Sequence, residues 1–280
     1  MDFFKGKKAV IATKHKKEKV IAPILENELG LICVTPAGLD TDRLGTFSGE
    51  IKRVDDPVTT LRKKCRMAIE ASGIPIAIAN EGSFSTHPSI YFAHADDELI
   101  MLLDAENDLE IMERELSLDT NFDGAEIKSI ADLTEFANKI GFDSHGIILK
   151  KAKDDYSSIF KENRSMAELI KNYHAVKNGD GSAYAETDMR AMRNPTRMKV
   201  IAKATEKLAI KAKSLCPNCS APGFGVAEAV KGLPCELCGL PTNSILKHIC
   251  RCRKCVFETE ILFPFGKRIE DPQYCDFCNP

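Results

Sequence analysis

Short apolar runs alternate with amphipathic segments over the first 215 residues. The apolar runs have the length and aliphatic content of buried strands, and they lie at residues 7–13, 31–35, 74–79 and 146–150. The segments with apolar residues at helical spacing are 17–29, 58–72, 130–140 and 165–176. Gly30 and Gly73 follow the first two of these segments and predict their ends. This alternation predicts an α/β fold, with a mixed sheet flanked by helices.

Two later segments complete the predicted domain. In residues 90–116, two apolar stretches flank Glu106-Asn107-Asp108, which predicts an antiparallel hairpin with an acidic outer surface. Asn194-Pro195 supplies an N-cap and a first-turn residue for a long helix that runs to about Lys213. The composition changes there, so we expect an α/β domain over residues 1–213 and a second module over residues 214–280.

Charge and hydropathy exclude some classes of protein. The chain of 280 residues carries 39 basic and 41 acidic residues, so its net charge of −2 gives no general attraction to nucleic acid. No apolar run reaches the roughly 18 residues that a membrane-spanning helix needs, and no association with a membrane is expected. The opening MDFFKGKK lacks the apolar stretch of a secretory signal, which favours a cytoplasmic location.

Cysteine is concentrated at the end of the chain. Nine of the 11 cysteines lie between Cys216 and Cys278. Eight of them form C-x2-C pairs, which are Cys216/Cys219, Cys235/Cys238, Cys252/Cys255 and Cys275/Cys278. A cluster of this kind in a chain without a secretion signal indicates metal rather than disulfides. Two such pairs close a tetrahedral four-sulfur site, so we predict two structural zinc ions in a zinc-ribbon-like module.

The spacing leaves the grouping of these pairs open. The simplest grouping joins neighbours in sequence, with Cys216/Cys219/Cys235/Cys238 as one site and Cys252/Cys255/Cys275/Cys278 as the other, although spacing alone does not exclude a crossed arrangement. Cys250 is then left over, and His248 is an alternative ligand. The run LKHICRCRKC also offers Lys247, Arg251, Arg253 and Lys254 to a phosphate backbone, but nearby acids favour a structural role.

Three constellations in the first domain are candidates for chemistry. The turn ATKHKKEK (12–19) offers lysines and a helix N-terminus to phosphate, or it is simply a solvated helix start. Asn80-Glu81-Gly82 follows a strand, where ligands bind in open α/β sheets, or it is a capped turn with His87 at the surface. The acid–arginine loop 185–198 suits magnesium and phosphate, or it is a salt-bridged helix cap; its charged residues are Glu186, Asp188, Arg190, Arg193 and Arg197.

Two resemblances extend this interpretation. Through GLDTDRLGTFSGE, ETDMRAMRNPTRM, GLPCELCG and YCDFCNP, nearly the whole chain resembles an uncharacterised bacterial family of unknown function. Through IATKHKKEK and LRKKCRMAIEASGIPIAIANEGSF, residues 8–92 resemble the inosine-triphosphatase-like enzymes, which hydrolyse non-canonical purine triphosphates to monophosphate and pyrophosphate. The second resemblance implies that Lys19 or Lys17 holds triphosphate, that Glu50 helps to bind magnesium, and that Glu81 binds the metal or positions the attacking water.

The predicted function is therefore a magnesium-dependent hydrolase of a nucleotide or related phosphate compound. Its predicted catalytic residues are Glu81, Glu50 and Asp188, and its predicted phosphate-binding residues are Lys17, Lys19, Arg190 and Arg197. A small phosphate-bearing ligand is the expected partner, ahead of nucleic acid. The alternative is a non-enzymatic zinc-binding adaptor that contacts RNA or a protein. The sequence predicts neither the substrate nor the oligomeric state.

Overall fold

The computed structural model describes residues 3–45 and 54–280, and the chain divides into two compact units. The first, the α/β unit, comprises Phe4–Glu106 and Met112–Ala209. The second, the cysteine-rich unit, comprises Met1–Phe3, Asn107–Ile111 and Ile210–Pro280. The division at 209/210 lies close to the predicted boundary at 213/214, but the short segment 107–111 also belongs to the cysteine-rich unit.

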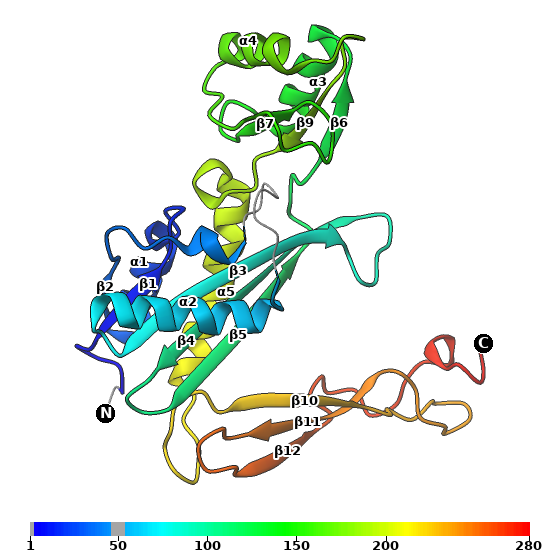
Figure 1. Ribbon diagram of the computed structural model, residues 1–280. Coiled ribbons are helices and arrows are strands. Elements are labelled where there is room, and N and C mark those ends of the chain that lie inside the picture. Colours follow the sequence, from blue (N-terminus) through cyan, green and yellow to red (C-terminus); the bar gives the residue numbers. More distant parts are fainter. Residues whose placement is uncertain (1–2, 46–53) are drawn as a thin grey trace. The chain divides into compact units, whose positions relative to one another are not determined.

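The larger sheet has five strands in the order β2-β1-β3-β4-β5 (Figure 1). Its strands are β1 (Lys8–Ala12), β2 (Ile32–Val34), β3 (Ile76–Thr86), β4 (His94–Asp104) and β5 (Leu109–Ser117). β1 runs parallel to β2 and β3, whereas β3 and β4 form an antiparallel pair, so the sheet is mixed as predicted. β3 continues to Thr86, beyond the predicted end at residue 79, because its second half pairs with β4.

Helices cover both faces of this sheet: α1 (Glu18–Leu29), α2 (Pro57–Ser72) and α5 (Pro195–Lys213). Asp56 caps α2, and Gly73 ends it in the left-handed conformation at φ 69°. The buried stripe of α2 packs on alternate residues of the strands, including Ala77 and Ala79 of β3. Glu81 therefore shares the α2 face, and Asn80 and Gly82 face the opposite side, where α5 lies.

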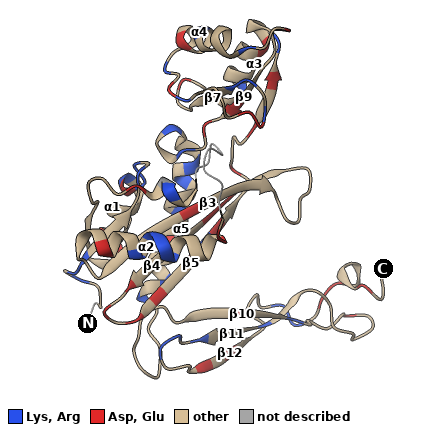
Figure 2. Ribbon diagram, viewed as in Figure 1, with Lys and Arg blue, Asp and Glu red and all other residues tan. Residues whose placement is uncertain are grey.

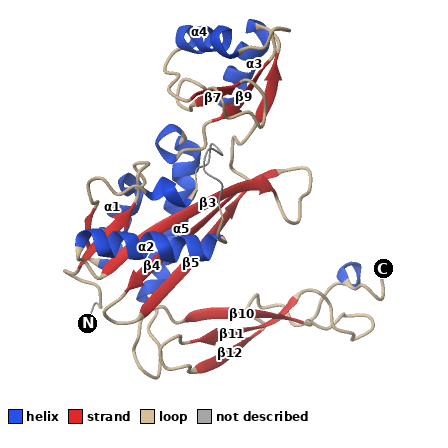
Figure 3. Cartoon of the chain, in the orientation of Figure 1, coloured by secondary structure: helices blue, strands red, loops and turns tan. Residues whose placement is uncertain are grey.

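A second sheet in the α/β unit was not foreseen as a separate element (Figure 3). Its strands, in the order β6-β9-β7-β8, are β6 (Gly124–Ile127), β9 (Ala183–Thr187), β7 (Ile147–Lys150) and β8 (Ile159–Phe160). Helices α3 (Ile130–Ile140) and α4 (Met166–Val176) begin at serine N-caps and share an apolar core with it. The predicted helices 130–140 and 165–176 are confirmed; their shared core depends on tertiary packing.

Short 3₁₀ helices complete the description of the backbone: η1 (Thr41–Leu44), η2 (Ala191–Arg193) and η3 (Pro272–Tyr274). The hairpin predicted within 90–116 is confirmed as β4 and β5, and Asn194 caps α5 by accepting a hydrogen bond from the Arg197 N–H at 2.9 Å. Among the described residues, no helix is long and apolar enough to cross a membrane. The inosine-triphosphatase-like fold stays a prediction.

The cysteine-rich unit is built on one antiparallel sheet. Its strands are β10 (Gly225–Lys231), β11 (Ile245–Arg251) and β12 (Glu258–Leu262), with β11 in the centre. Every residue of β12 is exposed, and the buried residues of this unit include five cysteines: Cys216, Cys235, Cys250, Cys252 and Cys275. A sheet that buries so little apolar surface needs cross-links to stay folded.

Candidate metal centres and a buried charge cluster

Eight cysteine thiols form two groups of four, and in each group all the sulfur atoms lie within 4.8 Å of one another. The shortest S···S separations are 3.6 Å for Cys216–Cys255, 3.7 Å for Cys219–Cys252, 3.6 Å for Cys238–Cys275 and 3.9 Å for Cys235–Cys278. A tetrahedral zinc site with Zn–S bonds of about 2.3 Å has S···S edges of about 3.8 Å, whereas a disulfide bond is about 2.0 Å long. Both groups can therefore hold zinc.

The grouping differs from the one that sequence adjacency predicts. Site 1 consists of Cys216, Cys219, Cys252 and Cys255, and site 2 of Cys235, Cys238, Cys275 and Cys278. The antiparallel sheet is the reason: the first pair precedes β10 and the third follows β11, and two antiparallel strands return the chain to the end where it began. The simplest pairing is thus wrong, and the crossed arrangement is the one that the fold adopts.

Each C-x2-C pair is held in a tight turn. At Cys216 the backbone N–H donates to Ala221 O at 2.8 Å, and the Ser220 N–H donates back to Cys216 O at 2.9 Å. Cys235 and Cys252 make the same outer hydrogen bond, to Leu240 and Phe257. Ser220, the residue after the second thiol, has φ 57°, a left-handed conformation that brings the chain back over the two sulfurs. The turns therefore bring the two thiols of a pair close together.

Cys250 and His248 lie outside both groups. Cys250 is a buried residue of β11 that pairs across the sheet with Val226 and Thr259. The ring of His248 lies edge-on to Phe265, with the centroids 5.6 Å apart. Within residues 3–45 and 54–280, only the two cysteine groups bring three or more metal-ligating side chains together. The ninth cysteine is thus part of the sheet rather than a ligand.

The basic run of the cysteine-rich unit is largely neutralised by acids. Figure 2 shows basic residues on β11 beside acidic residues on β12. Three ion pairs account for this: Lys247–Glu260 at 2.5 Å, Arg251–Glu258 at 2.6 Å and Arg253–Glu110 at 2.7 Å. The positive stripe that a phosphate backbone would need is therefore not formed by these residues.

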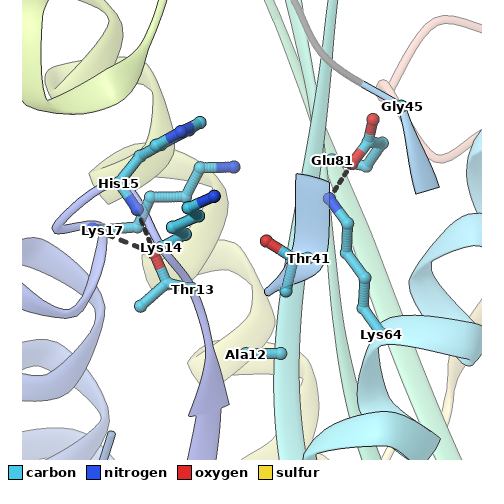
Figure 4. A pocket seen from close by; sticks show the side chains of 9 residues that line it. All are labelled: Ala12, Thr13, Lys14, His15, Lys17, Thr41, Gly45, Lys64 and Glu81. Carbon is cyan, nitrogen blue, oxygen red and sulfur yellow. Dashed lines mark hydrogen bonds and ion pairs between the residues drawn. The ribbon is translucent and has the colours of Figure 1, made fainter. Parts of the chain in front are cut away.

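In the α/β unit, a small pocket lies where β1 ends and α1 begins (Figure 4). Its polar lining residues are Thr13, Lys14, His15, Lys17, Thr41, Lys64 and Glu81. The Thr13 hydroxyl accepts hydrogen bonds from the Lys17 and His15 N–H groups, both at 3.3 Å, and so fixes the turn. Lys17 Nζ donates to the Asn80 carbonyl at 3.1 Å, which ties this turn to β3.

Seven buried polar residues form what we call the buried charge cluster: Lys17, Lys64, Asn80, Glu81, Asp96, Glu98 and Arg197. Three of them, Lys17, Lys64 and Glu81, also line the pocket. On the α2 face, Lys64 and Glu81 form an ion pair. On the opposite face, Arg197 Nε donates to Glu98 Oε1 at 2.6 Å, and Asn80 Nδ2 donates to Glu98 Oε2 at 2.9 Å. A buried charge is costly unless it is paired, so this cluster beside a pocket is the candidate functional site of the α/β unit.

Burial and neighbouring charges shift the ionisation of three members of this cluster. Burial, reinforced by the charges of Arg197 and Lys64, lowers the pKa of Lys17 to about 7. Burial acts to raise the pKa of Glu98, but the charges of Arg197 and Lys17 outweigh it and the pKa is lowered. Burial and the neighbouring Glu98 carboxylate raise the pKa of Asp96 to about 9.

The structure brings some predicted site residues together and separates others. Lys17, Glu81 and Arg197 all belong to the buried charge cluster, whereas Lys19 is exposed and does not line the pocket. Asp188 and Arg190 pair with each other at 2.7 Å, and Arg190 also contacts Glu162. This pairing agrees with the alternative interpretation of the acid–arginine loop, a salt-bridged helix cap. Glu50 lies outside the described residues.

Lys64, Asp96 and Glu98 were missed in the sequence. Each had a signal: Lys64 falls between Leu61 and Cys65 on the apolar face of its helix. Asp96 and Glu98 occupy alternate positions of a strand, on the same face as the buried apolar residues Ile100 and Leu102. A charged residue at a core position of a periodic pattern is the feature that identifies them.

Comparison with known proteins adds a family but no activity. A family model described as a domain of unknown function, DUF6671, matches residues 64–280, which include most of the buried charge cluster and both cysteine groups. No curated protein matches the chain. The chain thus belongs to the DUF6671 family, an uncharacterised family whose match covers more than three quarters of its length.

Proposed function

We propose that the α/β unit binds a phosphate-bearing small molecule in the pocket at the end of β1, and that it is a hydrolase of a nucleotide or related phosphate compound. One observation carries the binding proposal. The buried charge cluster holds three basic side chains, Lys17, Lys64 and Arg197, whereas its paired carboxylates are two, Glu81 and Glu98. An anion in the adjoining pocket would balance the positive charge that Lys17 carries in its protonated form.

The pocket also has the chemistry that phosphate prefers. Lys14, Lys17 and Lys64 line it, and Thr13 and Thr41 contribute hydroxyl groups. The turn opens α1, so the positive end of the helix dipole adds to the attraction. The low pKa of Lys17 has a direct consequence: a bound anion stabilises the ammonium form, and binding would take up a proton near pH 7.

Magnesium is a separate matter, because the described residues do not form a site for it by themselves. Glu81 is the only carboxylate among the described lining residues of the pocket, and it is already paired with Lys64. Magnesium in phosphate sites takes one or two carboxylates together with phosphate oxygens. The hydrolase part of the proposal therefore rests on the sequence resemblance, in which Glu81 positions a water molecule, and no step is derived through the metal.

The test is a binding and hydrolysis screen on the purified chain, with inorganic phosphate, pyrophosphate and nucleoside triphosphates, each with and without Mg²⁺. Lys17→Met should weaken binding at least tenfold, because it removes a buried cation of the cluster. Lys19→Met is the matched control and should bind as the wild type does, since Lys19 lies outside the pocket lining. Failure of the wild-type protein to bind any of these anions would overturn the proposal. Binding without turnover would remove only the hydrolase part.

The adaptor alternative finds less support where RNA is the partner. Its basic residues on β11 and beyond are engaged by Glu260, Glu258 and Glu110. An RNA gel-shift at low salt tests this directly, since phosphate contacts produce an affinity that falls steeply with salt. A salt-dependent affinity that disappears in Arg251→Ala would restore the alternative.

A further inference from the structure

We propose that Asp96 is a neutral carboxylic acid that donates its proton to Glu98, and that this proton preserves the positive charge of the anion pocket. The second clause rests on the proposed function; the first does not. Asp96 would then act as a positioning residue, which keeps Glu98 and Arg197 in place and keeps a third negative charge out of the cluster.

The surroundings of Asp96 carry the first part of the proposal. Its side chain, on β4, is completely buried. No N–H or O–H group of the described residues donates a hydrogen bond to either of its carboxylate oxygens. An ionised carboxylate at this position would have given up its hydration without replacement, which costs several kcal/mol. The neutral acid avoids most of that cost.

Glu98 is the partner for the proton. It lies two residues further along β4, on the same face of the sheet and within hydrogen-bond reach of Asp96. Its own carboxylate is held in the ionised form by two donors, Arg197 Nε at 2.6 Å and Asn80 Nδ2 at 2.9 Å. Two adjacent buried carboxylates do not both ionise. The proton is therefore held by Asp96, which accepts no hydrogen bond from the described residues. The O–H group of Asp96 then donates to Glu98.

The charged groups that face Asp96 among the described residues are Glu98 on its own strand, Arg197 on α5 and Lys17 at the start of α1. With Asp96 neutral, the cluster has three cations and two carboxylates. Ionisation would add a third carboxylate beside Arg197 and Lys17 and would cancel the excess charge that attracts an anion. The affinity of the pocket for an anion therefore depends on whether Asp96 keeps its proton.

The first test needs no ligand. The folded protein keeps a proton on Asp96 that the unfolded chain releases above about pH 4, so the contribution of Asp96 to stability falls as the pH rises toward 9. Asp96→Asn keeps the shape, donates an N–H to Glu98 and has no proton to lose. Relative to the wild type, its folding equilibrium constant should therefore increase with pH between 6 and 9, by up to tenfold per unit.

Asp97→Asn is the matched control. Asp97 lies on the other face of β4 and pairs with Arg114 at 2.6 Å, so its substitution should give no such rise with pH between 6 and 9. A flat difference between Asp96→Asn and wild type over this range would overturn the proposal. If the variant does not fold, the carboxyl carbon shift of Asp96 in the wild-type protein, followed by NMR, decides the same question: titration near pH 4 contradicts the proposal.

The second test measures the affinity for sulfate, a phosphate-like dianion whose charge is constant from pH 6 to pH 10. Wild-type affinity should fall between pH 7 and pH 9 more steeply than that of Asp96→Asn, because the deprotonation of Lys17 is common to both proteins. If no anion binds, the proposed function fails while the stability result still stands. If sulfate binds and the two proteins respond identically to pH, the link between Asp96 and the pocket is wrong although the pocket is real.

Discussion

Different interactions stabilise the fold of the cysteine-rich unit and the fold of the α/β unit. In the cysteine-rich unit β12 is exposed along its whole length, and a small apolar cluster forms around Cys216, Ala221 and Cys252. The α/β unit buries apolar faces of two sheets and still contains the buried charge cluster. The cysteine-rich unit therefore depends mainly on its thiol groups for stability. In the α/β unit the buried charges are unfavourable, and the apolar core offsets their cost.

The largest expected effect comes from removing the cysteines of the candidate metal sites in pairs. Cys216→Ser with Cys252→Ser should remove one zinc ion and leave the other, because both thiols belong to site 1. Cys216→Ser with Cys235→Ser should remove both ions. Since a structural zinc site contributes about 10–16 kcal/mol, each loss should unfold the surrounding turns while the α/β unit keeps its helical signal.

The measurement is zinc per chain by elemental analysis, with circular dichroism on the same samples. Grouping by sequence adjacency gives the reverse outcome, in which the Cys216/Cys235 double variant keeps one ion and the Cys216/Cys252 variant keeps none. Cys250→Ser is the control and should retain both ions, since Cys250 lies outside both groups.

The next effect in size concerns the buried ion pair on the α2 face. Lys64→Met removes the ion pair of the buried Glu81 and should reduce the free energy of unfolding by about 3–5 kcal/mol, measured by urea denaturation. Lys63→Met is the control from the same helix, because Lys63 pairs with Asp55 at the surface and should cost no more than about 1 kcal/mol. Equal effects in the two variants would contradict the idea that buried charge is costly here.

A smaller effect is expected at Gly82, where the backbone leaves room for the Arg197–Glu98 pair. A Cβ atom at this position would come within 2.5 Å of Glu98 Oε1 and 2.6 Å of Arg197 Nη2. Gly82→Ala should therefore destabilise the α/β unit by about 1–3 kcal/mol. Gly179→Ala introduces a Cβ with no atom within 4 Å and should leave the melting temperature nearly unchanged. A stable Gly82→Ala protein would show that the pair can move.

The smallest effect should come from the surface of the cysteine-rich unit. Arg251→Ala removes an exposed ion pair with Glu258 and should change stability by less than about 1 kcal/mol. Zinc content should be unchanged, because neither residue contacts a thiol group of either site. A large loss of zinc would indicate that strand pairing, rather than the turns, holds the sites together.

The sequence allowed much of this architecture to be predicted. The helices 130–140 and 165–176 follow from apolar periodicity and serine caps, and the hairpin 94–117 follows from two apolar stretches around a polar turn. The eight cysteines that could hold metal follow from their spacing alone, because a C-x2-C pair needs only a local turn to place two sulfurs together. Local geometry is enough for each of these features.

Only the tertiary structure decided which of these local features meet. The strand order of β10, β11 and β12 joined the first cysteine pair to the third, a relation that spacing leaves open. The packing of α2 and α5 on opposite faces of β3 and β4 brought Lys64 to Glu81 and Arg197 to Glu98, across 17 and 99 residues of sequence. Short-range preferences fix turns and helices, whereas contacts between distant residues depend on how the sheets are assembled, and that assembly decides both the metal sites and the buried charge cluster.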